Sequence, residues 1–574
     1  MLTFLSSQTG VINLARNKIV IIGGVATGPK AAARARRIDP DADITIIDKG
    51  ELFSYAGCGM PFYIEGLIED VNELMCTPLG VVRDESFFKN AKNVRVLGKT
   101  EAIKINRDSK RITVKNLRID EIQDIEYDKL ILATGAHPVT PPIEGIDLAR
   151  VYQLNNLKDA RAIRETLEKG AKEIVIIGAG LIGLETCGAF VSRGCKVTIV
   201  EILDQILPGL LDPTMAALLT NYLKDKGVKI LVSEKVTKIE GDEQGYVKKV
   251  ITDRNEINAE MIIVAVGVRP EAKLAKEAGL KLGDMGGILV NEYLQTNDPN
   301  IYAGGDCVEN LNLITGINSY VPMGSTANKH GRVIGDNITG GKTTFPGITG
   351  TIVFKILNYN VGKTGLGEKH AIDLGYEPIT CIRPSPDCAH YHPSTKPFII
   401  KLIVDRKTEK ILGGQGLGAG EVVKRIDTLA TAIKFGATVK DLVDIDLGYA
   451  PPYSTAIDAI AHAANIIRNK IDGLAKGISP IQLKEKIEQN DDFILLDVRT
   501  KKEIEKKTFK DKRVNLIPLG SLRDKLNQLP KEKEIIIYCQ SSLRAYEAQR
   551  IIEGEGFKDV KFLDGGLLAW PYDL

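Results

Sequence analysis

Two cysteines have sequence surroundings that suit thiol chemistry, and the first is Cys58. It lies in residues 53–63, Phe-Ser-Tyr-Ala-Gly-Cys-Gly-Met-Pro-Phe-Tyr, between glycines that let another group approach. A CxxxxC redox pair would need a second cysteine where the chain has Tyr63. Redox chemistry at Cys58 therefore requires a disulfide or persulfide with the substrate, which restricts the substrate to sulfur compounds or peroxides. The alternative is that Cys58 is a small buried hydrophobic residue.

The second candidate, Cys539, opens the loop Cys-Gln-Ser-Ser-Leu-Arg. Residues 534–538 predict a strand before this loop, and residues 545–553 predict a helix after it. Backbone N–H groups of a loop at a helix N-terminus stabilise a thiolate or persulfide, and Arg544 adds positive charge. The loop is thus a candidate sulfur carrier, with an inert docking module as the alternative.

A glycine-rich turn precedes the Cys58 segment. Residues 18–28, Lys-Ile-Val-Ile-Ile-Gly-Gly-Val-Ala-Thr-Gly, predict a buried strand that turns into an alanine-rich helix over residues 30–38. Gly23 permits a tight turn, and Gly28 allows helix and strand to pack closely. Asp48, after the next predicted strand, is placed to hold ribose hydroxyls. This βαβ pattern predicts a dinucleotide site, although the middle fingerprint glycine is Val25.

A second unit begins with residues 173–183, Glu-Ile-Val-Ile-Ile-Gly-Ala-Gly-Leu-Ile-Gly, and contains the full GxGxxG fingerprint. The following helix and strand lead to Glu201. A carboxylate there accepts a hydrogen bond from a 2′-hydroxyl and repels a 2′-phosphate, so NADH is favoured. Lys196 and Arg193 lie close in sequence, which keeps NADPH open. The fingerprint glycines are Gly178, Gly180 and Gly183.

Two further strand-and-turn segments complete a set, residues 130–135 and 300–306. With both fingerprints in this order, residues 18 to about 345 resemble the two-dinucleotide-fold flavoprotein reductases, whose first unit binds FAD and whose inserted second unit binds NAD(P)H. The resemblance implies that Asp306 contacts the ribityl chain and that His330 is structural. The implied cofactor-binding residues are Gly23, Gly24, Ala26, Gly28, Asp48, Lys49, Ala133, Thr134, Gly135, Gly178, Gly180, Gly183, Glu201, Gly267, Gly305, Asp306 and Ala327.

The lone cysteine resembles that of the NADH oxidase, peroxidase and coenzyme A disulfide reductase branch. The oxidases and peroxidases carry a histidine where this chain has Ala26, so oxygen and peroxide fall in rank as substrates. Residues 54–63 resemble the coenzyme A disulfide and persulfide reductases, whose cysteine forms a mixed disulfide with coenzyme A. Gly57 replaces that family's usual asparagine. A nearby helix N-terminus or oxidised flavin is expected to lower the pKa of Cys58.

The first predicted helix carries arginines on one face. Arg34 and Arg37, three residues apart, share that face and suit phosphate groups, while the alternative is a solvated basic surface. The resemblance implies that Arg37 helps to hold coenzyme A. Ser54 and Arg34 are further substrate-binding candidates by the same resemblance.

Residues 346–470 resemble the dimerisation domain of these reductases. The resemblance implies that two tyrosines, Tyr391 and Tyr449, reach across a homodimer and hydrogen-bond the sulfur intermediate. A tyrosine hydroxyl can donate a proton to a departing thiolate. Tyr453 is a rival to Tyr449, and His392 replaces a frequent second tyrosine. The alternative role for these tyrosines is interface packing.

The last hundred residues resemble a rhodanese domain. The resemblance is carried by the Asp-Val-Arg turn at 497–499, the loop that begins at Cys539, and Gly-Gly-Leu-Leu-Ala-Trp at 565–570, in this order. Cysteine-dependent phosphatases use a similar loop with one more residue, which is large enough for phosphate. This shorter loop suits a single sulfur atom. Ser542 replaces a common glycine.

Composition excludes several classes of protein. The chain of 574 residues is too long for one core, and 76 basic against 74 acidic residues give a net charge of +2, so nothing indicates nucleic acid or membrane binding. No apolar run is long enough to span a membrane, and no signal peptide is visible. The remaining cysteines lack metal-ligand spacing, which predicts a reducing cytoplasm and no metal site. They are Cys76, Cys187, Cys195, Cys307, Cys381 and Cys388.

The sequence therefore predicts an α/β protein with two dinucleotide-binding (Rossmann-like) domains, an α+β dimerisation domain and a C-terminal α/β rhodanese domain. The expected function is a cytoplasmic homodimeric FAD enzyme in which NADH reduces sulfur held at Cys58 while Cys539 handles persulfide sulfur. A fused sulfur carrier ranks coenzyme A persulfide or polysulfide above coenzyme A disulfide. The alternatives are an NADH oxidase and a redox-sensing sulfur-binding scaffold. The predicted segments are a tail (1–17), the FAD-binding domain (18–150 and 286–345), the NAD(P)H-binding domain (151–285), the dimerisation domain (346–470), a linker (471–477) and the rhodanese domain (478–574).

Overall fold

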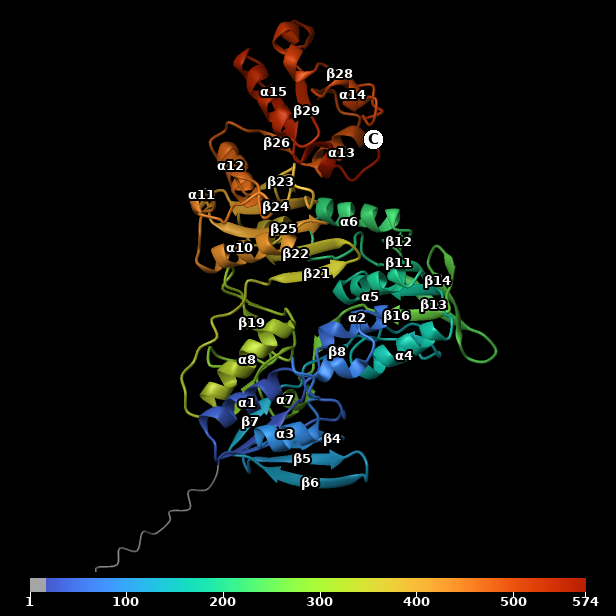
Figure 1. Cartoon of the computed structure of the whole chain (residues 1–574), viewed down its shortest axis with the longest axis vertical. Helices are drawn as coiled ribbons and strands as arrows, with labels where there is room; N and C mark the ends of the chain where they lie inside the picture. The colour runs from blue at the N-terminus through green and yellow to red at the C-terminus, as the bar shows by residue number, and fades with distance from the viewer. Residues whose placement is uncertain (1–16) are drawn as a thin grey trace, which may run out of the picture.

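The computed structural model describes residues 17–574, so residues 1–16 of the predicted tail lie outside the described residues. Four five-stranded sheets organise the described chain. In Figure 1 the unit built by the earliest residues lies at one end, the C-terminal unit lies at the other, and the remaining two lie between them. The predicted α/β fold with one antiparallel domain is confirmed.

The first sheet is parallel, with strand order β18-β7-β1-β2-β3. Its outer strand β18 comes about 170 residues after β7 in the chain, because a second unit is inserted between them. Helices α1 and α8 pack side by side against this sheet (Figure 1). The elements are β1 (Lys18–Ile22), α1 (Thr27–Ile38), β2 (Asp43–Ile47), η1 (Gly57–Gly59), α2 (Met60–Glu65), η2 (Val71–Met75), α3 (Glu85–Lys92), β3 (Arg95–Leu97), β7 (Lys129–Leu132), α7 (Lys273–Glu277), β18 (Ile301–Ala303), β19 (Asn310–Leu311), β20 (Asn318–Ser319) and α8 (Gly324–Asn337).

Two glycines allow α1 and α8 to approach closely. A Cβ atom at Gly331 would lie 2.7 Å from Lys30 Cβ, and one at Gly335 would lie 2.6 Å from Arg34 Cβ. The two contacts are four residues apart on each helix, so the helices run parallel with one face of each in contact. The N-termini of α1 and α8 therefore lie at the same edge of the first sheet.

The inserted unit has its own parallel sheet, with strand order β12-β11-β10-β16-β9. The antiparallel pair of β8 and β17 joins it to the first unit. The elements are β8 (Ala136–Pro138), β9 (Val151–Tyr152), α4 (Leu157–Glu168), β10 (Glu173–Ile177), α5 (Leu181–Ser192), β11 (Lys196–Val200), α6 (Pro213–Asp225), β12 (Lys229–Leu231), β16 (Met261–Val264) and β17 (Val268–Pro270). Antiparallel side sheets are formed by β4 (Thr100–Asn106), β5 (Arg111–Asn116) and β6 (Glu121–Glu126), and by β13 (Val236–Gly241), β14 (Val247–Thr252) and β15 (Glu256–Asn258).

The return to the first unit occurs earlier than predicted. Ala272, Ala275 and Leu280 pack in the apolar core that includes Val20 and Leu130 of the first sheet. Residues after β17 thus belong to the first unit, although the sequence places the boundary at residue 285. A short amphipathic helix does not itself reveal which sheet it covers, and this explains the difference.

The third sheet is antiparallel, with strand order β21-β22-β25-β24-β23, and α10 and α12 pack on it. Strands β24 and β25 are buried almost throughout, because a neighbouring domain or helix covers each face. The elements are β21 (Ile352–Ile356), β22 (Tyr359–Gly365), α9 (Glu368–Asp373), β23 (Pro378–Pro386), β24 (Pro397–Asp405), β25 (Ile411–Gly418), α10 (Val422–Lys434), α11 (Val439–Asp444) and α12 (Ala459–Ile471).

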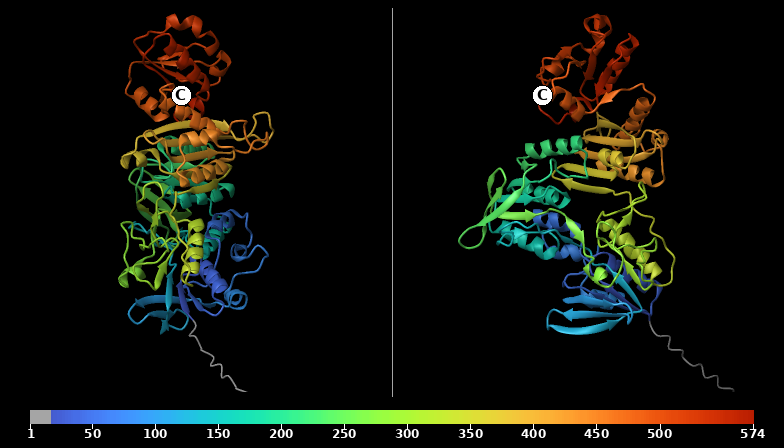
Figure 2. Two further views of the ribbon diagram at one scale, coloured as in Figure 1. Left: turned by 90° about the vertical axis from the view of Figure 1, so that its left-hand side faces the viewer. Right: turned by 180° about the vertical axis from the view of Figure 1, so that it is seen from behind.

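The C-terminal sheet is parallel, with strand order β26-β30-β29-β27-β28. Figure 2 shows this unit next to the antiparallel domain, at one end of the molecule. Its first strand, β26, begins at Gly477, the last residue of the predicted linker. The elements are β26 (Gly477–Ile478), α13 (Pro480–Glu488), β27 (Phe493–Asp497), α14 (Lys501–Ile504), β28 (Val514–Leu516), η3 (Leu519–Ser521), η4 (Arg523–Gln528), β29 (Glu534–Tyr538), α15 (Leu543–Gly554), β30 (Val560–Leu563) and η5 (Gly566–Ala569).

Candidate active site

The first glycine turn has a backbone that only glycine fits. Gly23 has a φ of +112°, and a Cβ atom there would lie 2.0 Å from the Ala133 carbonyl oxygen. Gly24 donates its N–H to Asp48 Oδ2 at 2.6 Å, and Gly50 donates to Asp48 Oδ1 at 2.7 Å. The carboxylate therefore holds the turn in place, and its remaining lone pairs are the ones left for a ribose.

Helix α1 begins earlier than predicted, at Thr27, and so includes Gly28. A Cβ atom at Gly28 would lie 2.0 Å from the Gly23 carbonyl oxygen, so the last fingerprint glycine packs inside the first helical turn. No described side chain caps this helix N-terminus, whose N-cap residue is Ala26. Its free N–H groups are the expected partners of a pyrophosphate.

The end of β18 meets α1 and α8 at the same place. Thr27 donates its hydroxyl to the Ala327 carbonyl at 2.9 Å, and Gly305, with a φ of +86°, donates its N–H to His330 Nδ1 at 3.0 Å. Burial lowers the pKa of His330 to about 4, so this histidine is a neutral structural acceptor. Burial raises the pKa of the neighbouring Asp306.

The second glycine turn repeats this geometry. Gly178 has a φ of +101°, and a Cβ atom there would lie 2.5 Å from the Ala265 carbonyl oxygen. The buried Glu201 accepts the Ala179 N–H at 2.7 Å and the Leu203 N–H at 2.9 Å. Glu201 thus fixes its turn as Asp48 does, a role that the sequence pattern did not reveal. Helix α5 starts at Leu181, with Gly180 as its N-cap and Gly183 packed in its first turn.

The remaining predicted cofactor residues lie around these turns. Thr134 donates its hydroxyl to the Glu271 carbonyl at 2.5 Å, and Gly135 has a φ of +74°. Lys49 and Gly267 are exposed. Both parallel units therefore present a glycine turn, a helix N-terminus and an acidic residue at the carboxyl edge of their sheets.

Cys58 lies in η1, immediately before α2, and is exposed. Its Sγ atom would lie 3.9 Å from a Cβ atom at Gly324, the first residue of α8. The thiol is therefore next to a helix N-terminus, as the sequence analysis expected, and is not a buried hydrophobic residue. Gly57 is open, whereas a Cβ atom at Gly59 would lie 2.3 Å from Leu74 Cδ2. Gly59 thus serves packing, which corrects the expectation that both glycines leave room for a ligand.

The charges around Cys58 differ from the expected ones. Burial raises the pKa of the Cys58 thiol, and the carboxyl groups of Glu185 and Asp306 raise it further. The positive end of α8 acts in the opposite direction. The protein groups around Cys58 therefore raise its pKa, which differs from the low pKa that the sequence analysis expected.

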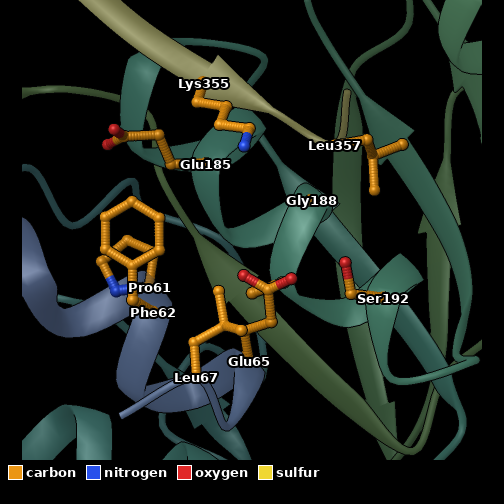
Figure 3. Close-up of a pocket in the computed structure, with 10 residues that line it drawn as sticks. Pro61, Phe62, Glu65, Leu67, Glu185, Gly188, Ser192, Lys355 and Leu357 are labelled. Carbon is orange, nitrogen blue, oxygen red and sulfur yellow. The ribbon is translucent and has the colours of Figure 1, made fainter. Parts of the chain in front are cut away.

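Glu185 was missed by the sequence analysis. It is the only charged residue in α5, which was a signal, and burial raises its pKa to about 7. Together with Glu65 and Lys355 it lines a small pocket of about 80 Å³ between α2, α5 and β21 (Figure 3). Glu185 therefore titrates near neutral pH close to the reactive thiol.

The two predicted phosphate-binding arginines have different surroundings. Arg34 forms an ion pair with Asp336 of α8, so it joins the two helices. Arg37 is exposed and has no ion-pair partner among residues 17–574. Ser54 has a φ of +48° and donates its N–H to the Gly24 carbonyl at 2.8 Å, which ties the Cys58 segment to the first glycine turn. Of the two arginines, Arg37 is thus the one without an ion-pair partner in the described residues.

The two tyrosine segments of the antiparallel domain meet. The Ala389 N–H donates to the Pro451 carbonyl at 3.1 Å. The buried Arg425 donates to the Asp387 carbonyl at 3.0 Å and to Asp458 Oδ2 at 2.7 Å, which fastens both segments to α10 and α12. Tyr391, Tyr449 and Tyr453 are 67%, 53% and 69% exposed. The segments therefore present phenol groups at the surface, where another subunit can meet them.

The loop that begins at Cys539 is held in place by hydrogen bonds and an ion pair. Cys539 is 1% exposed and directly follows β29, and Ser542 donates its hydroxyl to the Leu563 carbonyl at 3.0 Å. Ser542 has a φ of +79°, a conformation that favours glycine. Arg544 forms two hydrogen bonds with Glu503, at 2.6 and 2.9 Å. The hydrogen bond from Arg544 lowers the pKa of Glu503 to about 2, so the positive charge expected from Arg544 is balanced by a carboxylate.

No helix of the described residues is long and apolar enough to cross a membrane. Over residues 17–574, no group of three or more histidine, cysteine or acidic side chains is arranged to hold a metal ion.

Comparison with known proteins gives the family context. The family model of the pyridine nucleotide-disulphide oxidoreductases matches residues 17–326, that of their dimerisation domain matches residues 351–461, and that of rhodanese-like domains matches residues 479–572. The fold is similar to a NAD-dependent persulfide reductase from A. fulgidus, with a TM-score of 0.92 and 42% identity over 96% of this chain and 100% of that chain.

Two further relatives are similar over most of their length. The reduced CoADR-RHD of Bacillus anthracis has a TM-score of 0.90 and 36% identity, over 97% of this chain and 98% of that chain. The CoA-dependent NAD(P)H sulfur oxidoreductase of Pyrococcus abyssi is 37% identical over 454 residues, which are 79% of this chain and 98% of that protein.

Proposed function

We propose that the chain reduces coenzyme A persulfide or polysulfide with NADH and releases sulfide. The chain belongs to the pyridine nucleotide-disulphide oxidoreductase family and carries a rhodanese-like domain, and both facts support this proposal. The observation that carries this proposal is an exposed lone thiol, Cys58, at the N-terminus of α8 in a chain that also holds Cys539 in a preformed loop. The names of the relatives above support the same substrate class.

Membership of the family implies FAD and NAD(P)H, and the two glycine turns suit them. Side chains are excluded at Gly23 and Gly178, so a pyrophosphate can approach the backbone there, at the uncapped start of α1 and of α5. Asp306 and Ala327 lie where the first turn meets α8. Bound FAD would supply the two-electron link between the nicotinamide and the sulfur. The residues proposed to hold it surround α1, and those proposed for NAD(P)H surround α5.

We favour NADH over NADPH. Glu201 lies after the carboxyl end of β11, whereas Lys196 begins that strand and pairs with Glu173 at 2.9 Å. Five residues of strand separate the two by about 16 Å. Arg193 donates to the Ile64 carbonyl at 3.1 Å. Neither cation is therefore placed beside Glu201 to attract a 2′-phosphate.

Coenzyme A is proposed to lie along α1 and α8, with its sulfur at Cys58 and its phosphates near Arg37. The ten residue steps from Thr27 to Arg37 rise about 15 Å along the helix, which suits the long pantetheine arm. Lys30, Lys329 and Arg332 are also exposed on these two helices and lack ion-pair partners in the described part of the chain. They extend the positive surface that the sequence analysis assigned to Arg37.

The proposed reaction needs one thiol at Cys58. The Cys58 thiolate attacks the coenzyme A-bound sulfur of the persulfide, a mixed disulfide between Cys58 and coenzyme A forms, and hydrosulfide leaves. Two electrons from NADH and one proton then return the Cys58 thiolate and the coenzyme A thiol. We propose that Tyr391 and Tyr449 of the partner subunit in a homodimer donate hydrogen bonds to the leaving sulfur.

One experiment tests this function. The FAD-loaded protein is given NADH with coenzyme A persulfide, coenzyme A disulfide, polysulfide or oxygen, and kcat/KM is measured for each acceptor together with sulfide release and oxygen uptake. Persulfide or polysulfide should have the highest kcat/KM, with one sulfide per NADH from coenzyme A persulfide. A higher kcat/KM for oxygen would identify an NADH oxidase, and negligible turnover with every acceptor would identify a sulfur-binding scaffold.

A further inference from the structure

A buried ion pair joins the rhodanese-like domain to the dimerisation domain. Lys470, in the last turn of α12, donates from Nζ to Asp564 Oδ2 at 2.6 Å and to the Thr380 carbonyl of β23 at 2.7 Å. The Lys470 and Asp564 side chains are 9% and 7% exposed. One ammonium group thus binds a strand of one domain and a loop of the other, at the junction visible in Figure 1.

The linker between the two domains also lies against this ion pair. A Cβ atom at Gly477 would lie 2.7 Å from both Asp564 Oδ1 and Lys470 Nζ. A side chain at this position would therefore displace the charged groups of the ion pair. This close approach keeps the ion pair away from water, which strengthens the interaction and makes it costly to leave either charge alone.

Asp564 leads directly into the backbone that supports Cys539. Gly565 and Gly566 follow it with φ values of +75° and +58°, and a Cβ atom at Gly566 would lie 2.5 Å from the Cys539 carbonyl oxygen. Leu567 then donates its N–H to this carbonyl at 3.0 Å, and Leu568 donates to the Gln540 carbonyl at 3.0 Å. The segment fixed by Lys470 therefore carries two hydrogen bonds to the loop of the reactive cysteine.

The same segment packs against the dimerisation domain. A Cβ atom at Gly565 would lie 3.2 Å from Ile382 Cγ2 of β23. Since β27, β29 and β30 are parallel neighbours, their carboxyl ends share one edge of the sheet, and Asp564 follows β30 at that edge. The edge that bears Cys539 is therefore the one that contacts the dimerisation domain.

We propose that Lys470 is a positioning residue for Cys539: through Asp564 and the Gly565–Gly566 turn, the dimerisation domain sets the geometry of the Cys539 loop and with it the rate of sulfur transfer. This inference rests on the sulfur transfer at Cys539 that the proposed function contains. A thiolate or persulfide at Cys539 depends on loop N–H groups that converge on one sulfur atom, so a small displacement of the loop backbone weakens every one of those contacts.

Removal of Lys470 has a specific electrostatic result. Burial raises the pKa of Asp564, and Lys470 is the main group that opposes this rise. Without the ammonium, Asp564 either takes up a proton or turns toward water. In both cases the Gly565–Gly566 turn is no longer held to β23 through the Lys470 ammonium.

The test compares Lys470→Met with Lys476→Met in the full-length FAD-loaded protein. Lys476 is a matched control, because it lies in the same linker region but pairs with Glu553 inside the rhodanese-like domain, at 2.7 Å, and is exposed. Three quantities are measured: the rate of modification of Cys539 by a small methanethiosulfonate as a function of pH, sulfur transfer from thiosulfate to cyanide, and NADH-dependent reduction of coenzyme A disulfide.

Lys470→Met is expected to lower both the modification of Cys539 and sulfur transfer by about tenfold and to move the pH midpoint of the modification upward, because a displaced loop loses oriented contacts. Reduction at Cys58 should stay within about twofold, and Lys476→Met should change none of the three. An unchanged pH profile in folded Lys470→Met would overturn the proposal.

If Lys470→Met unfolds the C-terminal domain, the double variant Lys470→Met/Asp564→Leu replaces the test, since it leaves no unpaired buried charge. A folded double variant with wild-type Cys539 reactivity would also overturn the proposal. If the wild-type protein transfers no sulfur while modification of Cys539 still responds to Lys470, the proposed sulfur transfer fails and the positioning role stands.

Discussion

The two candidate cysteines, Cys58 and Cys539, lie in regions that are built in opposite ways. Cys58 is exposed, and its neighbours come from η1, the start of α8 and α5, which are far apart in the chain. Cys539 is buried, and Leu567 and Leu568 of the same domain donate backbone hydrogen bonds to its loop. A site assembled from distant segments stays open for a cofactor and a substrate, whereas a loop at a helix N-terminus is nearly complete within one domain.

The charges differ in the same way. Burial, Glu185 and Asp306 raise the pKa of Cys58, so the protein groups around this thiol disfavour the thiolate. At Cys539 the nearest cation, Arg544, is already paired with Glu503. Reactivity at Cys58 is thus expected to depend on what binds there, and reactivity at Cys539 on loop geometry.

The largest expected effect comes from replacing Cys58, and it distinguishes the role of this thiol from that of Cys539. Cys58→Ser should lower NADH-dependent reduction of coenzyme A persulfide and disulfide by at least about 100-fold, because the nucleophile is lost. The yellow flavin should stay bound, since the glycine turns do not involve Cys58. Steady-state kinetics and the visible absorbance spectrum check both points. Cys76→Ser is the control, because the Cys76 thiol donates to the Asn72 carbonyl and belongs to neither proposed site. Equal activity in the two variants would remove Cys58 from the mechanism.

The converse change is Cys539→Ser. Sulfur transfer to cyanide should fall at least about 100-fold, while reduction of coenzyme A disulfide should stay within about twofold, because Cys539 takes no part in the proposed reduction at Cys58. If coenzyme A carries sulfur from Cys539 to Cys58, sulfide release from donors that react only at Cys539 should also stop. Full turnover of this variant with every sulfur donor would show that the two sites work independently.

The third expected effect concerns the Cys58 site alone. Arg37→Ala should raise KM for coenzyme A substrates by about tenfold with little change in kcat, because a phosphate contact would be equally strong in the ground state and the transition state. Arg254→Ala is the control for the change in net charge. Arg254 lies in another domain, is exposed and has no ion-pair partner in residues 17–574. An equal change in KM for both variants would mean that Arg37 acts only through the overall field.

Local sequence was sufficient for the parts of each site that are contiguous. The glycine turns and the loop that begins at Cys539 were both predicted from segments of about ten residues. These segments succeed because one backbone conformation and one helix N-terminus determine their geometry. The family and the fold class follow from their order.

Contacts between distant segments could not be predicted in this way. Arg34 and Asp336 lie 302 residues apart, so nothing in the first helix showed that Arg34, one of the two candidate phosphate-binding arginines, is already paired. The clash that requires Gly59 comes from Leu74 on a neighbouring turn. The influence of Glu185 on Cys58 depends on the second unit folding against the first. These features follow from packing, which a single sequence does not display.

The smallest effect tests the electrostatic part of the comparison. Because the Glu185 carboxylate raises the pKa of Cys58, Glu185→Gln should lower that pKa and move alkylation of Cys58 to lower pH. Burial raises the pKa of Glu185 to about 7, so wild type and variant should react alike at pH values where Glu185 is protonated. Above that range the variant should react about two- to threefold faster, since a like charge has been removed.

The measurement is the rate of iodoacetamide modification of the Cys58 peptide against pH in the oxidised FAD-loaded protein. Glu65→Gln is the matched control, because Glu65 lines the same pocket but does not act on the pKa of Cys58. Cys539 in the same samples provides an internal reference that should not respond to Glu185. A parallel change at both cysteines would indicate a global effect of the substitution and would remove the electrostatic distinction between the Cys58 site and the Cys539 loop.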